Sequence, residues 1–335
     1  ADLIIGPVFS YNLEKISSWA AERGIPVVSP VPLRDRDILT NRPTLYRVFP
    51  SEKMAHRIMA GELKSHPGSN IIFLHGDSAM YDPSTALLWE SVRDVAREMA
   101  PYDTIGPVPF WFRGMSSRRD AYSGVTSLDT LFSSERENIV ILASKNSSVI
   151  SSAFSAIHSL LRKYDIRVIG YPEVRDLETI DLKYFYDLEL LVPAECYVDL
   201  DAPEARAFSN SFMKRFQTEP MAGSFAWRGF DIALYFIGGM ALYGNDFLAD
   251  PGLFNPLLLC LEPDFRRDSR SEGYENRGMF ILQYRKDMTI EVKRPWPRIY
   301  FEEEPAVVHE ADSVVTDPFS GSSVRSPGRW GGHQH

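Results

Sequence analysis

The first thirty residues constrain the fold most strongly, because they indicate a strand, a helix and a second strand in close succession. Residues 3–5 are an apolar run typical of parallel strands buried on both faces, and Gly6 ends it. A helical stripe of apolar residues starts at Leu13, and Gly24 suits the end of that helix. Residues 25–28 make the next apolar run. This unit predicts a parallel sheet with a helix N-terminus at its carboxyl edge, where ligands bind in such sheets.

Ser10 stands where this first helix is expected to begin. Its hydroxyl can accept a hydrogen bond from the first free backbone N–H groups, which is the ordinary use of serine as an N-cap residue. The same position would also suit contact with a ligand anion at the helix N-terminus. Capping is the commoner role, and the residue type alone leaves both open.

The alternation of strand and helix continues along the chain. The expected strands are residues 45–50, 70–74, 104–110, 138–142 and 166–169. The expected helices are residues 51–64, 85–99, 120–134, 148–163, 203–216 and 223–243. A late β-hairpin is expected from residues 279–284 and 289–292. These alternations indicate an α/β fold with a doubly wound parallel sheet.

Composition narrows the class of protein. A chain of 335 residues is long enough for two domains or lobes, each with its own core. The net charge of −9 and the lack of a basic stripe argue against a nucleic-acid partner. The sequence has no apolar run near the roughly 20 residues that span a bilayer. Residues 301–335 begin with an acidic run, continue rich in Ser, Gly and Pro, and are expected to be disordered.

The two cysteines do not suggest a disulfide framework. Cys196 and Cys260 are the whole complement, and they lack a CxxC spacing. They could pair in an oxidising compartment, but the sequence favours two buried free thiols.

The sequence offers no credible catalytic constellation. It contains no nucleophile elbow, P-loop, HExxH motif or EF-hand loop, and its histidines are scattered without metal-ligand spacing, apart from the last two in the tail. We therefore expect neither an enzyme nor a bound metal or cofactor.

Polar and aromatic side chains instead gather at the carboxyl ends of the expected strands. They are Ser10, Ser29, Tyr81, Ser144, Asn146 and Glu173. Phe225 is a further candidate, because it lies in the first turn of its helix while most other aromatic residues there follow a core stripe. Such a set is typical of a cleft that binds a small molecule.

The order of several short motifs resembles the type I periplasmic binding proteins, the branched-chain amino-acid receptor group. The matching pieces are the strand edge at 5–10, the Gly-Ile-Pro-x-x-Ser-Pro segment at 24–30, residues 45–51, the loop at 75–81, Gly170-Tyr171-Pro172-Glu173, the helix start at 223–233 and the hairpin at 278–292. The resemblance covers about residues 1–295, and its specificity lies in the order of many weak motifs.

This resemblance implies a two-lobed fold, in which each lobe is a doubly wound, mostly parallel sheet with helices on both faces and three strands form the hinge. Lobe 1 would comprise residues 1–66 and 199–262, without the strand–helix–strand–helix that opens this family. Lobe 2 would comprise residues 67–198 and 263–300, with the closing hairpin. The hinge crossings are expected near residues 64–69, 191–199 and 261–267.

The resemblance also implies roles for the candidate side chains. Ser10 and nearby backbone N–H groups would hold the α-carboxylate of a ligand, and Val31 and Leu33 would line the same wall. Tyr81 and Glu173 would come from the other lobe, with Glu173 pairing with the α-ammonium. Leu33 replaces the family's usual Thr, and residues 144–146 replace a Gly/Tyr-rich edge. These departures make an ordinary branched-chain amino acid a less fitting ligand.

The expected function is capture of a small polar ligand, such as an amino acid or short peptide, by closure of the hinge. It would serve transport through an ABC permease or sensing. The alternative is an envelope-tethered interaction module on the same fold that binds cell-wall fragments or a wall-synthesis partner. Either role places the protein in the periplasm or cell envelope, with membrane attachment only through an anchor, such as a lipid, outside this chain.

Overall fold

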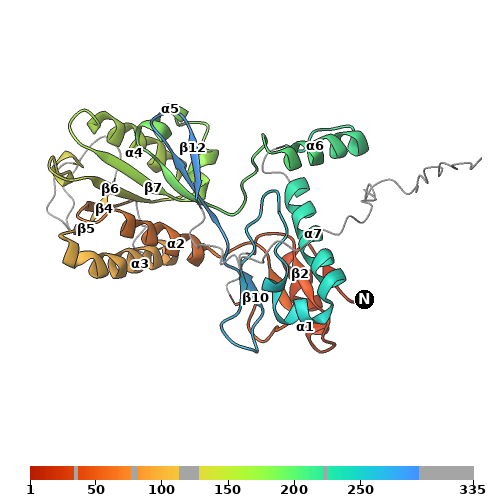
Figure 1. Cartoon of the computed structure of the whole chain (residues 1–335). Coiled ribbons are helices and arrows are strands. Elements are labelled where there is room, and N and C mark those ends of the chain that lie inside the picture. The colour runs from red at the N-terminus through yellow and green to blue at the C-terminus, as the bar shows by residue number, and fades with distance from the viewer. Residues whose placement is uncertain (34–36, 77–81, 113–127, 222–224, 294–335) are drawn as a thin grey trace, which may run out of the picture. The chain divides into compact units, whose positions relative to one another are not determined.

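The computed structural model describes residues 1–33, 37–76, 82–112, 128–221 and 225–293, and these residues form an α/β protein built on two sheets (Figure 1). Among the described residues, the strand order is β1-β2-β3-β10-β9 in one sheet and β12-β11-β8-β7-β6-β4-β5 in the other. Neighbouring strands are parallel in most pairs of both sheets. The predicted α/β fold class is confirmed.

The five-stranded sheet begins with the unit predicted from the first thirty residues. Its strands are β1 (Ile4–Ile5), β2 (Val27–Ser29), β3 (Leu45–Arg47), β9 (Phe265–Arg266) and β10 (Tyr274–Asn276). Its helices are α1 (Ser10–Ala21), α6 (Pro203–Phe216), α7 (Phe225–Tyr243) and α8 (Asn245–Ala249). Helix α1 buries Leu13 and Ala20 against the sheet, as its apolar stripe predicts, while Trp19 stays 45% exposed.

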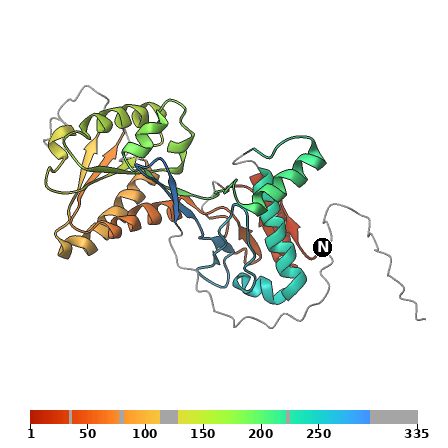
Figure 2. The ribbon, with the colours of Figure 1, turned by 45° about the horizontal axis from the view of Figure 1, so that its top comes forward.

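The seven-stranded sheet carries the second core. Its strands are β4 (Asn70–His75), β5 (Ile105–Trp111), β6 (Asn138–Ala143), β7 (Ile166–Gly170), β8 (Leu191–Ala194), β11 (Phe280–Tyr284) and β12 (Ile290–Lys293). Its helices are α2 (Glu52–Gly61), α3 (Pro83–Met99), α4 (Ser147–Leu160) and α5 (Leu182–Asp187). Its 3₁₀ turns are η1 (Glu62–Ser65), η3 (Ala100–Tyr102), η4 (Leu128–Leu131) and η5 (Pro172–Asp176), whereas η6 (Pro251–Leu253) follows α8 beside the five-stranded sheet. Helices α2 and α3 cover one face of this sheet and α4 and α5 the other (Figure 2).

The two cores divide the chain at other points than the sequence suggested. Helix α2 was expected in lobe 1, within residues 1–66, but Met54 and Met59 pack in the same core as Phe73 of β4. Strands β9 and β10 were expected in lobe 2, within residues 263–300, but they extend the five-stranded sheet. The chain therefore changes sheets at residues 48–51, after β8 and at residues 277–279. The first crossing was expected near residues 64–69, but Pro67 and Gly68 there only form the turn that leads into β4. In the sequence, Pro and Gly mark a turn and a connection between lobes in the same way.

The predicted helix at 120–134 lies partly outside the described residues, and in its described part, from residue 128 on, the structure has the 3₁₀ turn η4. The predicted disordered tail at 301–335 lies wholly outside the described residues. None of the helices in the described ranges is long and apolar enough to cross a membrane.

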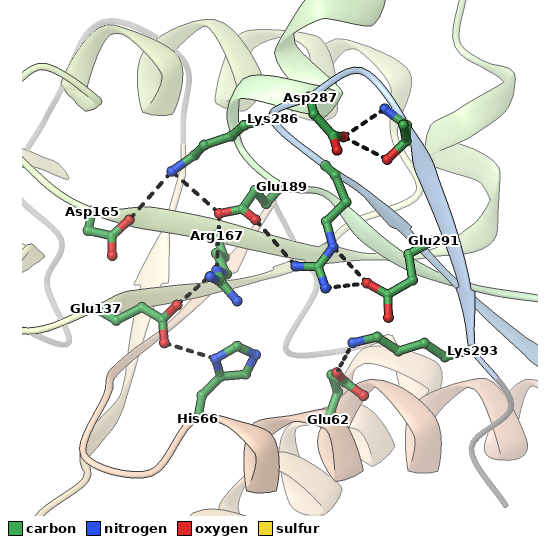
Figure 3. Close-up of polar contacts among 12 residues, drawn as sticks. Glu62, His66, Glu137, Asp165, Arg167, Glu189, Lys286, Asp287, Glu291 and Lys293 are labelled. Atoms are coloured by element: carbon green, nitrogen blue, oxygen red, sulfur yellow. Dashed lines mark hydrogen bonds and ion pairs between the residues drawn. The ribbon is translucent and has the colours of Figure 1, made fainter.

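A charged network holds the β11–β12 hairpin onto the amino ends of β6, β7 and β8 (Figure 3). Glu137 and Glu189 precede β6 and β8, and Arg167 Nε lies 2.8 Å from Glu137 and 3.4 Å from Glu189. Arg285 and Lys286 of the hairpin turn lie 3.6 Å and 3.4 Å from Glu189. The charged side chains of this network pair with one another, and they lie at the opposite end of the sheet from the carboxyl edge where ligands bind. We therefore assign the network a structural role.

Candidate functional site

A lysine lies between two carboxylates at the carboxyl edge of the seven-stranded sheet. Lys145 follows β6, Glu173 lies in η5 just after β7, and Glu52 is the first residue of α2. Lys145 Nζ is 2.5 Å from Glu52 Oε1 and 3.2 Å from Glu173 Oε1. The same ammonium lies 4.9 Å from the ring centroid of Tyr171. Three separate elements thus converge on one cation.

The pKa values of this cluster follow from its partial burial and its pairing. Burial alone would raise the pKa of Glu52, but hydrogen bonds from Lys145 and Ser84 and the lysine charge outweigh burial and lower the pKa. Burial alone would lower the pKa of Lys145, but its hydrogen bond with Glu52 and the charges of Glu173 and Glu52 raise it. Both groups are therefore charged at neutral pH, and the cluster is a preorganised cation with two anionic partners.

A buried histidine and tyrosine support the cluster from beneath. Tyr171 Oη lies 3.2 Å from Nε2 of His56, which is 1% exposed, and Ser84 Oγ lies 3.4 Å from the same nitrogen. Burial raises the pKa of the Tyr171 hydroxyl well above its ordinary range, so this hydroxyl stays protonated. The ring face that Lys145 contacts is thereby fixed in position.

Ser144 and Asn146 lie at this edge, as predicted, and both are occupied in shaping the turn into α4. Asn146 Oδ1 accepts hydrogen bonds from the backbone N–H groups of Ser148 at 3.0 Å and Val149 at 3.2 Å, as an N-cap residue does. Ser144 Oγ accepts a hydrogen bond from Asn146 N at 3.2 Å. These hydrogen bonds between side chains and backbone N–H groups fix the turn that contains Lys145 and the start of α4.

In the five-stranded sheet, Ser10 is the first residue of α1 and is exposed. The N-cap position belongs to Phe9, which has extended backbone angles and makes no side-chain capping bond. Ser10 therefore does not have the capping role that its residue type favours, and its hydroxyl faces solvent at the helix N-terminus.

Val31 and Leu33 are held by side chains from the neighbouring strands. Ser29 Oγ donates to Val31 O at 3.0 Å, and Arg47 Nη2 donates to Leu33 O at 2.7 Å. The Leu33 side chain is 6% exposed and packs in the core beneath α1, so it does not line an open wall as expected from the sequence. An apolar side chain at this position is drawn to the core, whereas a hydroxyl would favour solvent.

The remaining two candidates are Phe225 and Tyr81. Phe225 begins α7 and is 66% exposed. One turn further on, the guanidinium of Arg228 lies 5.1 Å from the ring centroid of Phe49. Tyr81 lies outside the described residues.

Sequence reasoning missed several charged members of this region, among them Glu52 and Glu195. Burial raises the pKa of Glu195, which follows β8, and the Arg228 charge opposes that rise while Glu173 adds to it. Nothing in the spacing of Glu52 marks it as a site residue, because its contact depends on which sheet α2 packs against. Lys145 lies two residues after the end of β6, and that position was a usable signal.

Two further features lie apart from this cluster. A shallow, mostly apolar groove runs along β1 and α1, lined by Ile4, Asn12, Lys15 and Trp19 among others, and none of the predicted site residues lines it. In the described part of the chain, no group of three or more His, Cys, Asp or Glu side chains is arranged to hold a metal ion.

Comparison with known proteins relates this geometry to one class of fold. Neither a family model nor a curated protein matches the sequence. A putative branched-chain amino acid ABC transporter from Rhodospirillum rubrum matches over 82% of this chain and 75% of its own, with 14% identity and a TM-score of 0.55. A branched-chain amino acid ABC transporter periplasmic ligand-binding protein from Burkholderia xenovorans matches over 88% and 76%, with 14% identity and a TM-score of 0.53.

An ABC transporter substrate-binding protein from Desulfitobacterium hafniense, in complex with Leu, matches over 87% of this chain and 80% of its own, with 16% identity and a TM-score of 0.51. At such low identity these similarities concern the fold. They agree with the predicted fold, two mostly parallel α/β lobes as in type I periplasmic binding proteins.

Proposed function

We propose that this chain, with its periplasmic-binding-protein fold, is a non-enzymatic solute-binding protein that captures a small polar ligand between its two lobes by hinge closure. The observation that carries the proposal is the cluster of Glu52, Lys145 and Glu173. It lies at the carboxyl edge of parallel strands, where α/β sheets bind ligands. It is also accessible, since the side chains of Lys145 and Glu173 are 45% and 51% exposed.

The cluster suits a ligand that carries both an ammonium and a carboxylate. Lys145 offers a cation to a ligand carboxylate, and Glu173 offers an anion to a ligand ammonium. At about 4 Å such a pair interacts with about 4 kcal/mol at the dielectric of a protein surface, before desolvation is subtracted. We therefore propose an amino acid or short peptide as the ligand, with Glu173 as the partner of its ammonium and with Lys145 and Ser10, at the N-terminus of α1, as partners of its carboxylate.

The proposed biological role is delivery of this ligand to an ABC permease, or sensing, outside the cytoplasm. Its support is that the three solved structures compared above are named as ABC transporters or as their binding proteins. The role involves no chemical change of the ligand. A ligand of known mass that is added to the protein and then recovered from it should therefore show the same mass in mass spectrometry.

A second candidate function is favoured by one observation. Lys145 already pairs with Glu173, so an amino-acid ammonium would have to share or displace a cation of the chain itself. On the same fold, an envelope-tethered interaction module that binds cell-wall fragments would not need Glu173 for an ammonium. The two functions differ in the ligands that they predict.

The test is a thermal-shift screen of the full chain against amino acids, short peptides and muropeptides, followed by calorimetry. Binding at a hundred times Kd adds about 2.7 kcal/mol of stability. An amino-acid hit that weakens about tenfold or more in Glu173→Gln would support solute capture. Glu178→Gln, an exposed neighbour, is the matched control and should bind normally. Silence toward amino acids with binding of muropeptides would favour the second function, and an amino-acid affinity unchanged by Glu173→Gln would remove Glu173 from the site.

A further inference from the structure

The two cysteines of the chain lie on neighbouring segments. Cys196 follows β8 by two residues, where the chain leaves the seven-stranded sheet, and Cys260 precedes β9 of the five-stranded sheet. The backbone N–H of Tyr197 donates to the carbonyl of Cys260 at 3.1 Å, so the two segments run side by side. Both side chains contribute to one hydrophobic cluster, and the two thiols share a hydrogen bond.

The surroundings of the two thiols differ. Cys260 is 1% exposed, whereas Cys196 is only partly buried. Arg228 of α7 hydrogen-bonds to the Cys196 side chain and brings a positive charge beside it. Asp231, one turn further along α7, is fully buried and lies beside the Cys260 side chain. One face of α7 thus presents a cation to one sulfur and a carboxylate to the other.

This asymmetry gives the two thiols different acidities. The hydrogen bond from Cys260 and the Arg228 charge lower the pKa of Cys196 against the opposing effect of burial. The hydrogen bond to Cys196, burial and the Asp231 charge raise the pKa of Cys260. Because the thiolate is the reactive form, Cys196 has the character of an attacking thiol and Cys260 that of a resolving thiol.

We propose that Cys196 and Cys260 are a redox-active pair, which closes to a disulfide by exchange with a low-molecular-weight or protein disulfide. The thiolate of Cys196 attacks one sulfur of the incoming disulfide, the S–S bond of that disulfide breaks, and its first thiolate leaves and takes up a proton. Cys260 then gives its proton to the carboxylate of Asp231 beside it, and its thiolate attacks the sulfur of Cys196 in the mixed disulfide. The second thiolate leaves and is protonated. Two thiols of the chain are oxidised and one external disulfide is reduced to two thiols.

The closed bond would join the segment that leaves one sheet to the core of the other sheet. It would restrain one of the connections between the two sheets and would close a loop from residue 196 to residue 260. This inference stands on the contacts of the cysteines and does not rest on the proposed ligand.

The first experiment follows the disulfide itself. The full chain, purified with reductant, is equilibrated in buffers of varied reduced and oxidised glutathione, quenched with an alkylating agent under denaturing conditions and analysed by mass spectrometry. In oxidising buffer we expect the protein to lose the mass of two hydrogen atoms. After proteolysis we expect a single crosslinked peptide that joins Cys196 to Cys260. Cys260→Ser should accumulate a mixed glutathione disulfide at Cys196, while Cys196→Ser should accumulate neither product. Two free thiols in wild-type protein at full oxidation, or a mixed disulfide at Cys196 that never resolves, would overturn the proposal.

The second experiment tests the role of Arg228 in positioning and activating the attacking thiol. In native protein at pH 7, Cys196 should be alkylated at least about tenfold faster than Cys260. Arg228→Gln should slow alkylation of Cys196 several-fold and move the midpoint of its pH profile upward. Arg206→Gln, which removes an exposed arginine of α6, is the control and should leave that profile unchanged. Equal alkylation of both thiols, or a profile that Arg228→Gln does not move, would contradict the assignment.

Discussion

Lys145 Nζ lies 3.2 Å from Oε1 of Glu173, so the carboxylate assigned from the sequence to a ligand ammonium already faces a cation of its own chain. The two residues follow neighbouring parallel strands, β6 and β7, and their meeting is a consequence of strand order. Glu52 completes the pair from a helix that packs on the same sheet. Any ligand at this edge would have to exchange one of these contacts for its own.

Replacing Lys145 by Met tests how far the lysine stabilises its partners. The Glu52 side chain is only 27% exposed, and it would lose both the hydrogen bond and the charge that lower its pKa. We expect the free energy of unfolding at pH 7 to fall by about 1 kcal/mol, since the lysine itself is half-exposed. Urea unfolding measures the change, and Lys183→Met, an exposed lysine of α5, should be neutral. A variant as stable as wild type would show that the pair contributes no net stability.

Asp231→Asn tests a buried carboxylate that organises the segment around Cys260. Its two oxygens accept hydrogen bonds from the backbone N–H groups of Leu259 at 2.9 Å, Cys260 at 2.6 Å and Leu261 at 2.9 Å. Asn would direct its NH₂ group at one or two of these donors, which would then lack an acceptor. We expect destabilisation by about 2–4 kcal/mol in chemical denaturation. Asp246→Asn, at an exposed position of α8, serves as the reference, and equal stability of the two variants would contradict this role.

Glu137→Gln tests the pH dependence of the network in Figure 3. The hydrogen bond from His66 at 2.8 Å, opposed by burial and aided by the charges of His66 and Arg167, holds the pKa of Glu137 below its ordinary value of 4.5. A carboxylate with a lowered folded pKa contributes stability above its unfolded pKa, and this contribution is lost as the pH falls through the folded pKa.

The variant should therefore lose about 1–2 kcal/mol at pH 7, and its deficit should shrink below about pH 4.5. Urea titrations at a series of pH values measure this deficit. Glu135→Gln, two residues away and exposed, should show no such pH dependence. A deficit that stays constant down to acid-induced unfolding would contradict the linkage.

Most elements could be predicted from the sequence because their signals are local. The apolar runs at 70–74, 138–142 and 166–169 lie within β4, β6 and β7, where they are buried on both faces. The hairpin of β11 and β12 follows from two strand-like runs around a polar turn. Such features depend on neighbouring residues alone.

What the sequence could not predict depends on pairing between distant segments. Strand β10 adds to β3 across more than two hundred residues, and no periodicity in either segment specifies that partner. The same holds for α2, and with it for Glu52, whose place beside Lys145 follows from packing. Phe9 rather than Ser10 occupies the N-cap position of α1, a displacement of one residue that residue preference does not resolve.

Gly278→Ala tests the third connection between the sheets, at residues 277–279. A Cβ atom at Gly278 would overlap the backbone carbonyl of Glu262, which cannot turn away as a flexible side chain would. Gly278 N also donates to Asn276 Oδ1 at 3.0 Å, and Asp264 N donates to the same oxygen at 2.7 Å, so the two segments are fixed against each other. To relieve the overlap, the two segments would have to move apart. We therefore expect the free energy of unfolding, measured in urea, to fall by about 2–3 kcal/mol.

Gly229→Ala provides the opposite expectation. Gly229 is exposed within α7, and a Cβ atom there meets nothing within 4 Å. Because alanine is the better helix former, this variant should be unchanged or more stable by up to about 1 kcal/mol. Similar stabilities for the two alanine variants would mean that residues 277–279 have room to shift, and that the close approach of Gly278 to Glu262 does not restrain this connection.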